Sequence, residues 1–293
     1  MRLDDFDPGS INVEDQRGGG FPIGMRGGSI GCGTLVIALI GALVFGIDPT
    51  QMLGGVDQGQ QQTQQEGGAA NRTGGTTVAQ SCTVDEVSRE TCNALSSLNK
   101  TWAPIFAKSN VAFTQPKLVF YSQMGRSGCG TAQSAMGPFY CPNDQGIYID
   151  TDFYGELAER LGAKGDFARD YVVAHEFGHH VQKLVGLADQ VRSAQEQSPS
   201  GANQLQVRME LQADCYAGVW AAHNKDRIEP GDIESGLNAA HQIGDDTLMK
   251  GAGRRPVQAS FTHGSSAQRV EWLRKGLESG NEDDCDTFAD LRK

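Results

Sequence analysis

The chain has 293 residues and a formal net charge of −11, with 36 acidic and 25 basic side chains. This length allows one large domain or two small ones, with a sizeable core. The acidic balance and the lack of a Lys/Arg cluster argue against nucleic acid as the main partner, because phosphate binding requires clustered basic side chains.

The first 80 residues differ in composition from the rest. Residues 1–28 are rich in Gly and Asp and show neither helical nor strand periodicity. Residues 29–47, SIGCGTLVIALIGALVFGI, carry no charge, and the 18 apolar or small residues from Ile30 are near the lower limit for a transmembrane helix. Residues 48–80 are dominated by Gly, Gln and Thr, which predicts a flexible linker.

Three interpretations of the apolar run compete. A cleaved signal peptide is disfavoured by the long preceding segment and by the lack of an A-x-A site after the run. A lipoprotein signal is disfavoured because Cys32 lies at the start of the run, whereas a lipid-modified cysteine follows one. A retained single-pass anchor in the cell membrane fits best. Arg17 and Arg26 precede it, so the positive-inside rule predicts a cytoplasmic N-terminus and an extracytoplasmic C-terminal part.

The cysteines also favour an exported domain. Seven are present, and six of them lie after the linker. An even number in an exported domain suggests disulfides, and six cysteines allow 15 pairings. Cys129 and Cys141 enclose a short loop and are the pair we expect to form. The alternative is that these side chains are free buried thiols.

Residues 81–293 are predicted to form one mostly helical α+β domain with a small sheet. Thr83 and Glu86 resemble a capping box, and Pro104 is expected to end or kink the first helix. A Gly-rich loop, residues 125–137, lies between two strands and is a candidate lid. In chain order, helix 83–108 precedes strands 117–122 and 146–150, and helices follow at 152–162, 166–185, 204–223, 232–243 and 265–279.

The helix predicted over residues 166–185 contains an H-E-x-x-H motif, His175-Glu176-Phe177-Gly178-His179. Residues four apart share one face of a helix, so His175 and His179 can bind one Zn²⁺ ion. Glu176 then lies beside the metal, where it can act as the general base for a water molecule. The alternative is a surface helix whose histidines make ordinary hydrogen bonds.

A second set of candidate residues follows in MELQADCYAGVWAAH. Glu210 and Asp214 are also four apart on a predicted helix. Catalytic zinc commonly has three protein ligands and a position for water, so Glu210 can be the third ligand. Asp214 can accept a hydrogen bond from the outer nitrogen of a ligand histidine, and His175 is the expected partner. Taken alone, the two acids would fit a solvated helix face equally well.

These motifs resemble those of gluzincin-type metallopeptidases, and more closely the bacterial membrane-anchored neutral zinc metallopeptidases. The segments NVEDQRGGG, GCGTAQSAMGPFYCPNDQGIYID, THGSSAQR and CDTF extend the resemblance over nearly the whole chain apart from the linker. The resemblance implies a zincin-like domain with one catalytic Zn²⁺, outside the membrane and held there by an N-terminal anchor.

The resemblance also concerns FTHGSSAQR, because related zinc endopeptidases carry a T-H-P-x-x-x-x-R segment. Here Gly264 stands where the related segment has proline. His263 near the zinc would stabilise the tetrahedral intermediate. The alternative is a loop histidine at the start of a helix, with Arg269 on a solvated face.

Other residues leave alternatives open. Strand 146–150 is either an edge strand that binds the substrate peptide or an internal strand. His180 is turned about 100° from His179 around the helix, so we do not expect it to be a ligand. His223 and His241 have no ligand spacing.

The predicted function is zinc-dependent hydrolysis of peptide bonds in a peptide or protein substrate. His175, His179 and Glu210 would bind Zn²⁺, with Glu176 and His263 as catalytic residues. A non-catalytic, membrane-anchored zinc-binding scaffold or partner-binding module is the alternative, although a structural site would normally have four protein ligands. A third hypothesis is hydrolysis of cell-wall amides.

Overall fold

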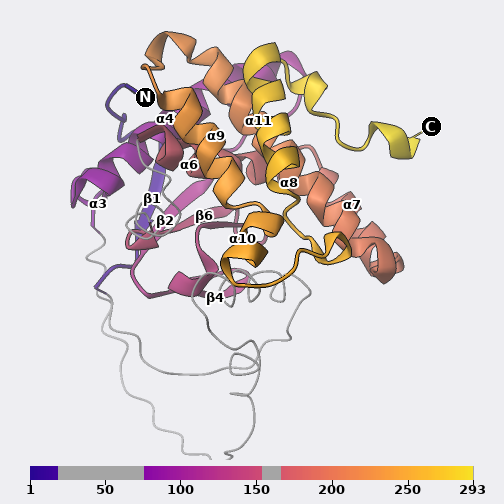
Figure 1. The fold of residues 1–293 in the computed structure, drawn as a ribbon. Coiled ribbons are helices and arrows are strands. Elements are labelled where there is room, and N and C mark those ends of the chain that lie inside the picture. The colour runs from indigo at the N-terminus through magenta and orange to yellow at the C-terminus, as the bar shows by residue number, and fades with distance from the viewer. Residues whose placement is uncertain (19–75, 154–165, 293) are drawn as a thin grey trace, which may run out of the picture.

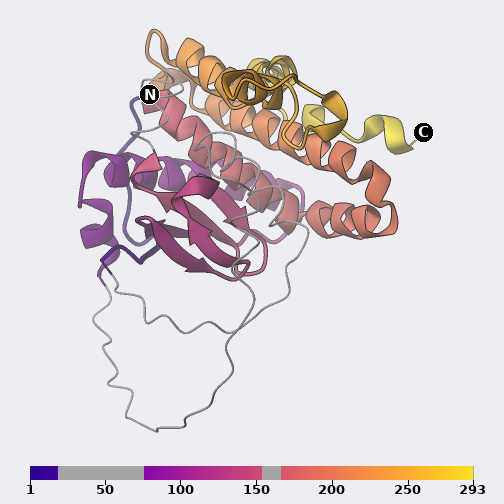
Figure 2. The ribbon, with the colours of Figure 1, turned by 60° about the horizontal axis from the view of Figure 1, so that its bottom comes forward.

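A four-stranded sheet carries helices on one face and a short hairpin on the other (Figures 1 and 2). The computed structural model describes residues 1–18, 76–153 and 166–292. The strands are β1 (Asn12–Asp15), β2 (Lys117–Tyr121), β3 (Met124–Ser127), β4 (Gly130–Gln133), β5 (Phe139–Cys141) and β6 (Gly146–Asp150). The helices are α3 (Val78–Cys82), α4 (Glu86–Lys108), α6 (Asp166–Leu184), α7 (Leu187–Gln197), α8 (Ala202–His223), α9 (Asp232–Gln242), α10 (Asp245–Gly251) and α11 (Ser266–Ser279). The expectation of a mostly helical α+β fold is confirmed.

The sheet has the strand order β1-β2-β6-β5, parallel except for the antiparallel pair β5–β6. Successive side chains of a strand point to opposite faces. Leu118 and Ile147 therefore join the core beneath the helices, whereas Val119 and Tyr148 pack with Ala132 of the β3–β4 hairpin. The strand at 146–150 is internal rather than an edge, because it pairs with β2 on one side and β5 on the other.

The N-terminal segment corrects one expectation. Residues 1–28 show no periodicity, yet Asn12–Asp15 form β1 and pair in parallel with β2. Ile11 and Met1 are buried in the main core. A four-residue strand with Val13 as its single apolar residue is too short and too polar to produce a recognisable alternation.

Three further boundaries differ from those expected. The helix predicted over 83–108 begins only at Glu86 as α4, after the short helix α3 has ended at Cys82. Asp85 rather than Thr83 caps α4, by accepting a bond from Ser88 N at 2.7 Å. Pro104 lies inside α4, which continues to Lys108. The Gly-rich stretch 125–137 contains most of the β3–β4 hairpin rather than a simple loop.

Parts of the chain lie outside the described residues. They include the expected anchor at 29–47, nearly all of the expected linker at 48–80 and most of the expected helix at 152–162. Among the ranges that the structure describes, no helix combines the length and apolar character needed to cross a membrane.

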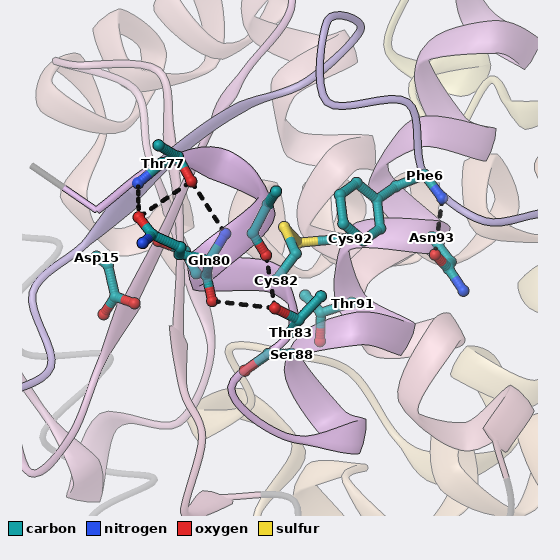
Figure 3. Close-up of a disulfide and its surroundings, with 12 residues drawn as sticks. Phe6, Asp15, Thr77, Gln80, Cys82, Thr83, Ser88, Thr91, Cys92 and Asn93 are labelled. Atoms are coloured by element: carbon teal, nitrogen blue, oxygen red, sulfur yellow. Dashed lines mark hydrogen bonds between the residues drawn. A yellow bond between two sulfur atoms is a disulfide. The ribbon is translucent and has the colours of Figure 1, made fainter.

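The six cysteines after the linker form three disulfides: Cys82–Cys92, Cys129–Cys141 and Cys215–Cys285. The predicted Cys129–Cys141 pair is confirmed. Cys82–Cys92 joins α3 to α4 and lies beside the N-terminal segment (Figure 3). Cys215–Cys285 closes a loop of 70 residues and joins α8 to the chain after α11. In a chain-entropy estimate, a loop of that length stabilises the fold by about 4 kcal/mol.

Helices α6, α8 and α11 approach one another closely because glycines lie where they cross. A methyl group on Gly178 of α6 would lie 2.8 Å from the Cα atom of Ala213 in α8. One on Gly218 of α8 would overlap the Leu273 carbonyl oxygen of α11, and one on Gly276 of α11 would overlap the Cys215 carbonyl oxygen. Side chains at these positions would therefore separate the helices.

We predict that Gly218→Ala destabilises the fold by about 1–3 kcal/mol, because the added methyl group overlaps the backbone of α11. Gly251→Ala is the matched control: this helical glycine has nothing within 4 Å of an added methyl group. Alanine there is expected to be neutral or to stabilise by up to about 1 kcal/mol. Urea unfolding of the full chain measures both free energies, and equal stability of the two variants would contradict the close-packing argument.

Candidate metal centre

The H-E-x-x-H motif lies in the middle of α6, which runs between the sheet and the C-terminal helices (Figure 2). The helix contacts α4, α8 and α9 as well as β5 and β6. His175 and Glu176 are buried, and His179 is partly exposed. The motif therefore belongs to a core helix, and the alternative of a surface helix is wrong.

His175, His179 and Glu210 form a cluster between α6 and α8. Each offers one ligand atom, and these atoms all lie within 4.8 Å of one another. Glu210 contacts both rings, with Oε2 3.1 Å from His175 Nε2 and Oε1 3.6 Å from His179 Nε2. This is the single group of three or more potential ligands among the described residues that could hold a metal ion. The structure thus brings together the three residues proposed as ligands.

The outer nitrogen of each histidine is also held. His175 Nδ1 lies 2.8 Å from Asp214 Oδ1, the contact expected from the sequence. His179 Nδ1 lies 2.9 Å from Gln182 Oε1, a contact that sequence reasoning missed. Gln182 donates in turn to Met209 O on α8 at 2.7 Å. Gln182 lies three residues after His179 on the same helix face, and this spacing could have predicted the contact between them.

Asp214 is fully buried and accepts bonds from three side chains. Besides His175, the Tyr171 hydroxyl donates to Oδ1 at 2.6 Å, and Arg269 donates through Nε to Oδ2 and through Nη2 to Oδ1, both at 2.8 Å. Burial would raise the pKa of Asp214, but the Arg269 and His175 charges outweigh it and lower the pKa to about 2. Asp214 is therefore a permanent carboxylate.

Arg269 comes from α11 and is 2 % exposed, so the alternative of a solvated arginine is wrong. Its Nη2 also lies 3.2 Å from the Tyr171 hydroxyl oxygen, and Nη1 donates to Ile243 O at 3.4 Å. The close crossing of α8 and α11 at Gly218 and Gly276 brings this guanidinium to Asp214. Sequence reasoning noted Arg269 but not its partner, because α8 and α11 are far apart in the chain.

Charges within the cluster shift the pKa values of its members. Burial alone would lower the pKa of His175, but the Asp214 and Glu210 carboxylates raise it to about 9. Burial would raise the pKa of Glu210, yet His179 and His175 lower it well below the usual range. The cluster therefore contains an ionised carboxylate facing two imidazoles, an electrostatic arrangement that favours a cation among them.

Glu176 is buried beside the cluster, and burial raises the pKa of its carboxyl group although His175 and His179 oppose this shift. Within the described ranges, no hydrogen bond or ion pair involves its side chain. A buried carboxyl group without a fixed partner and with a raised pKa is suited to accept and release a proton.

His263 lies in the loop before α11, and Asp245 at the start of α10 holds this loop. Asp245 Oδ2 accepts bonds from the backbone N–H groups of Thr262, His263 and Gly264 at 2.7, 2.7 and 3.1 Å. Asp245 Oδ1 lies 3.1 Å from His263 Nδ1. His263 is also among the groups whose charge lowers the pKa of Glu210, after the larger influence of His179. Asp245 was not anticipated from the sequence.

The glycine that departs from the related T-H-P pattern has a local explanation. Gly264 has a φ of 92°, in the left-handed region, and its N–H bonds to Asp245. Proline fixes φ near −65° and has no N–H group, so it could not adopt this conformation. The substitution is therefore consistent with a loop held by Asp245.

The remaining histidines lie outside the cluster. His180 Nε2 faces Thr114 O at 2.7 Å and its Nδ1 lies 3.0 Å from the Tyr140 hydroxyl of β5, so its ring points away from the ligand atoms. His223 and His241 are exposed and do not contribute to the cluster.

Comparison with known proteins agrees with this geometry. Residues 4–288 match the family described as "Putative neutral zinc metallopeptidase". The chain belongs to this family. It is 43% identical over 289 residues to "Uncharacterized protein YpfJ" of Escherichia coli (strain K12), covering 96% of each chain. It is also 39% identical over 206 residues to "Uncharacterized protein Rv2575" of Mycobacterium tuberculosis (strain ATCC 25618 / H37Rv), covering 66% of this chain and 68% of that one. No solved structure matches the chain.

The contact between Asp214 and His175 yields a prediction. Asp214→Asn removes the carboxylate that orients His175, so zinc affinity is expected to fall about 10- to 100-fold. Asp189→Asn on α7 is the control, because Asp189 is exposed and pairs with Lys183 away from the cluster. Competition with a zinc-binding dye measures both affinities. Unchanged zinc affinity in Asp214→Asn would show that this carboxylate does not contribute to zinc binding.

Proposed function

We propose that the protein is a zinc-dependent peptidase. The observation that carries this proposal is the cluster of two imidazoles and one carboxylate, with its ligand atoms within 4.8 Å of one another. Two histidines and one glutamate form a common donor set of catalytic zinc sites, which keep one position open for water. A structural site would usually have four protein ligands, and the described residues supply three.

The residues fit a zinc ion by donor type, burial and charge. His175, His179 and Glu210 would hold it, while Asp214 and Gln182 fix the orientation of the two rings. When bound, zinc lowers the pKa of a water molecule and polarises the scissile carbonyl group.

Glu176 supplies the proton transfers in this proposal. Its carboxylate accepts a proton from the attacking water and then delivers it to the leaving amine. The buried position next to His175 supports this role, because a raised pKa brings the carboxyl group closer to the pH at which it must both gain and lose a proton.

His263 is proposed to stabilise the negative charge that develops on the carbonyl oxygen. Asp245 fixes the ring through Nδ1 and the loop through three backbone bonds. Nε2 has no hydrogen-bond partner within the part of the chain that the structure describes. It can therefore donate to an oxyanion when it carries a proton. A positioned donor of this kind costs little reorganisation during the reaction.

The peptide substrate is proposed to bind along β5. This strand pairs with β6 and with no other strand among the described residues, and it contacts α6. Tyr140 of β5 bonds to His180 of α6, so the strand lies against the helix that carries His175 and His179. An edge strand binds extended peptides through main-chain hydrogen bonds and makes few demands on their sequence.

Location is also a proposal. Three disulfides favour an oxidising compartment outside the cytoplasm, because cytoplasmic thiols are kept reduced. The uncharged run 29–47 suggests attachment to the membrane.

Glu176→Gln tests the reaction. In the full chain, purified in detergent and loaded with zinc, cleavage of casein is expected to fall at least about 100-fold while bound zinc is unchanged. Glu278→Gln, an exposed change on α11, is the control and should retain full activity. If the wild type and Glu176→Gln bind equal amounts of zinc and the wild type cleaves neither casein nor cell-wall fragments, the result would favour a zinc scaffold. Cleavage of cell-wall fragments alone would favour amide hydrolysis there.

His263→Ala tests the proposed oxyanion donor. We expect kcat to fall about 100- to 1,000-fold with KM and zinc content nearly unchanged, because the lost bond forms in the transition state. His241→Ala removes an exposed histidine and serves as the control. A change in KM with kcat preserved would instead indicate that His263 binds substrate.

A further inference from the structure

The N-terminal segment, residues 1–17, is built into the domain that carries the metal cluster. Its strand β1 pairs with β2 through four residues, from Asn12 opposite Lys117 to Asp15 opposite Phe120. Met1 and Ile11 are 7% and 6% exposed and belong to the same core as His175's helix. Strand pairing and core burial together require the segment to lie against the domain.

Polar contacts at the end of β1 hold the segment to three other elements, β3, α3 and α4. The Gln16 side chain accepts from Arg126 N at 2.8 Å and donates to Arg126 O at 3.0 Å, a reciprocal pair with β3. Arg17 donates to Ser88 Oγ of α4 at 2.6 Å and to Ser81 O of α3 at 2.8 Å. Its guanidinium also lies 4.6 Å from the centre of the Phe120 ring.

The earlier part of the segment is held as well. Phe6 N donates to Asn93 Oδ1 of α4 at 2.9 Å (Figure 3), and Asn99 of α4 donates to Ser10 O at 3.0 Å. Ion pairs join Arg2 to Glu229 and Asp4 to Arg227, both at 2.6 Å, in the chain between α8 and α9. The contacts thus spread over the sheet, α4 and the C-terminal half of the domain.

This docking conflicts with a single membrane crossing between residues 18 and 76. One crossing by residues 29–47 would put residues 1–17 and residues 76–293 on opposite sides of the bilayer, where β1 could not pair with β2. Exchange of β1 between two copies does not remove the conflict, because two copies with the same orientation have all their N-terminal segments on the same side.

We propose that residues 1–17 and the metal-binding domain occupy the same side of the membrane, with the N-terminal segment as a docked strand of that domain. The expected cytoplasmic N-terminus and extracytoplasmic domain are therefore replaced by a shared compartment. Arg17, which supported the opposite orientation, is an internal ion-pair partner of Asp15 at 2.6 Å in the folded chain. The proposal does not depend on peptidase activity.

Labelling from one side of the membrane tests the shared compartment. In full-length Cys32→Ser protein in intact cells, Asp5→Cys and Glu278→Cys place single exposed thiols on the segment and on α11. A membrane-impermeant maleimide should label both to the same extent, within about twofold, before and after permeabilisation. Labelling of one position before permeabilisation and of the other only afterwards would overturn the proposal.

Crosslinking tests the docking itself. The pair Asn12→Cys and Lys117→Cys joins residues that lie opposite each other in β1 and β2. A specific protease site is inserted between residues 57 and 66, and the protein is cleaved there in membranes. The N-terminal fragment should then remain joined to the rest of the chain by the new disulfide until a reductant is added. The pair Asn12→Cys and Glu278→Cys is the control for random crosslinking. Release of the fragment without reductant, to the extent seen in this control, would show that β1 is not docked in the membrane-bound protein.

Discussion

The arrangement of the candidate ligands His175, His179 and Glu210 depends on one buried ion pair, between Asp214 and Arg269. Asp214 has no exposed surface, and an isolated carboxylate there would be strongly destabilised. Arg269 supplies two hydrogen bonds and a compensating charge, which leaves the carboxylate ionised to orient His175. Removing one partner of such a pair leaves an uncompensated buried charge, which typically costs several kcal/mol. Helix α11, which carries no ligand of the cluster, is therefore needed for its geometry.

That ion pair in turn requires helices that approach more closely than ordinary side chains allow. Gly218 and Gly276 let α8 and α11 cross with their backbones in contact, and Gly178 does the same for α6 and α8. Gly178 stands within the H-E-x-x-H motif, so one short stretch of sequence provides the two imidazoles, the buried carboxyl group of Glu176 and the packing that brings Glu210 to the imidazoles. The Cys215–Cys285 disulfide ties α8 to the end of the chain one residue beyond Asp214.

The sequence was most informative where chemistry and helical spacing coincide. His175, His179 and the pair Glu210 and Asp214 could be predicted to share helix faces, and their grouping followed from the donor set that zinc requires. Arg269's ion pair, Asp245's loop contacts and Gln182's role could not be derived in the same way, because each depends on which helices meet in space. Strand β1 was missed for a different reason: its pairing with β2, rather than its own pattern, makes it a strand.

The position of β1 also constrains the order in which the fold can form. Asn12 pairs with Lys117, so the first strand to be synthesised has no partner until more than a hundred further residues have followed. Parallel pairing across such a separation is entropically costly and slow to form. In the three-stranded part of the sheet, β2-β6-β5, the paired residues are much closer in sequence, so this part can assemble earlier. The strand nearest the start of the chain is therefore expected to be among the last to join the sheet, and until then the edge of β2 is a site for mispairing.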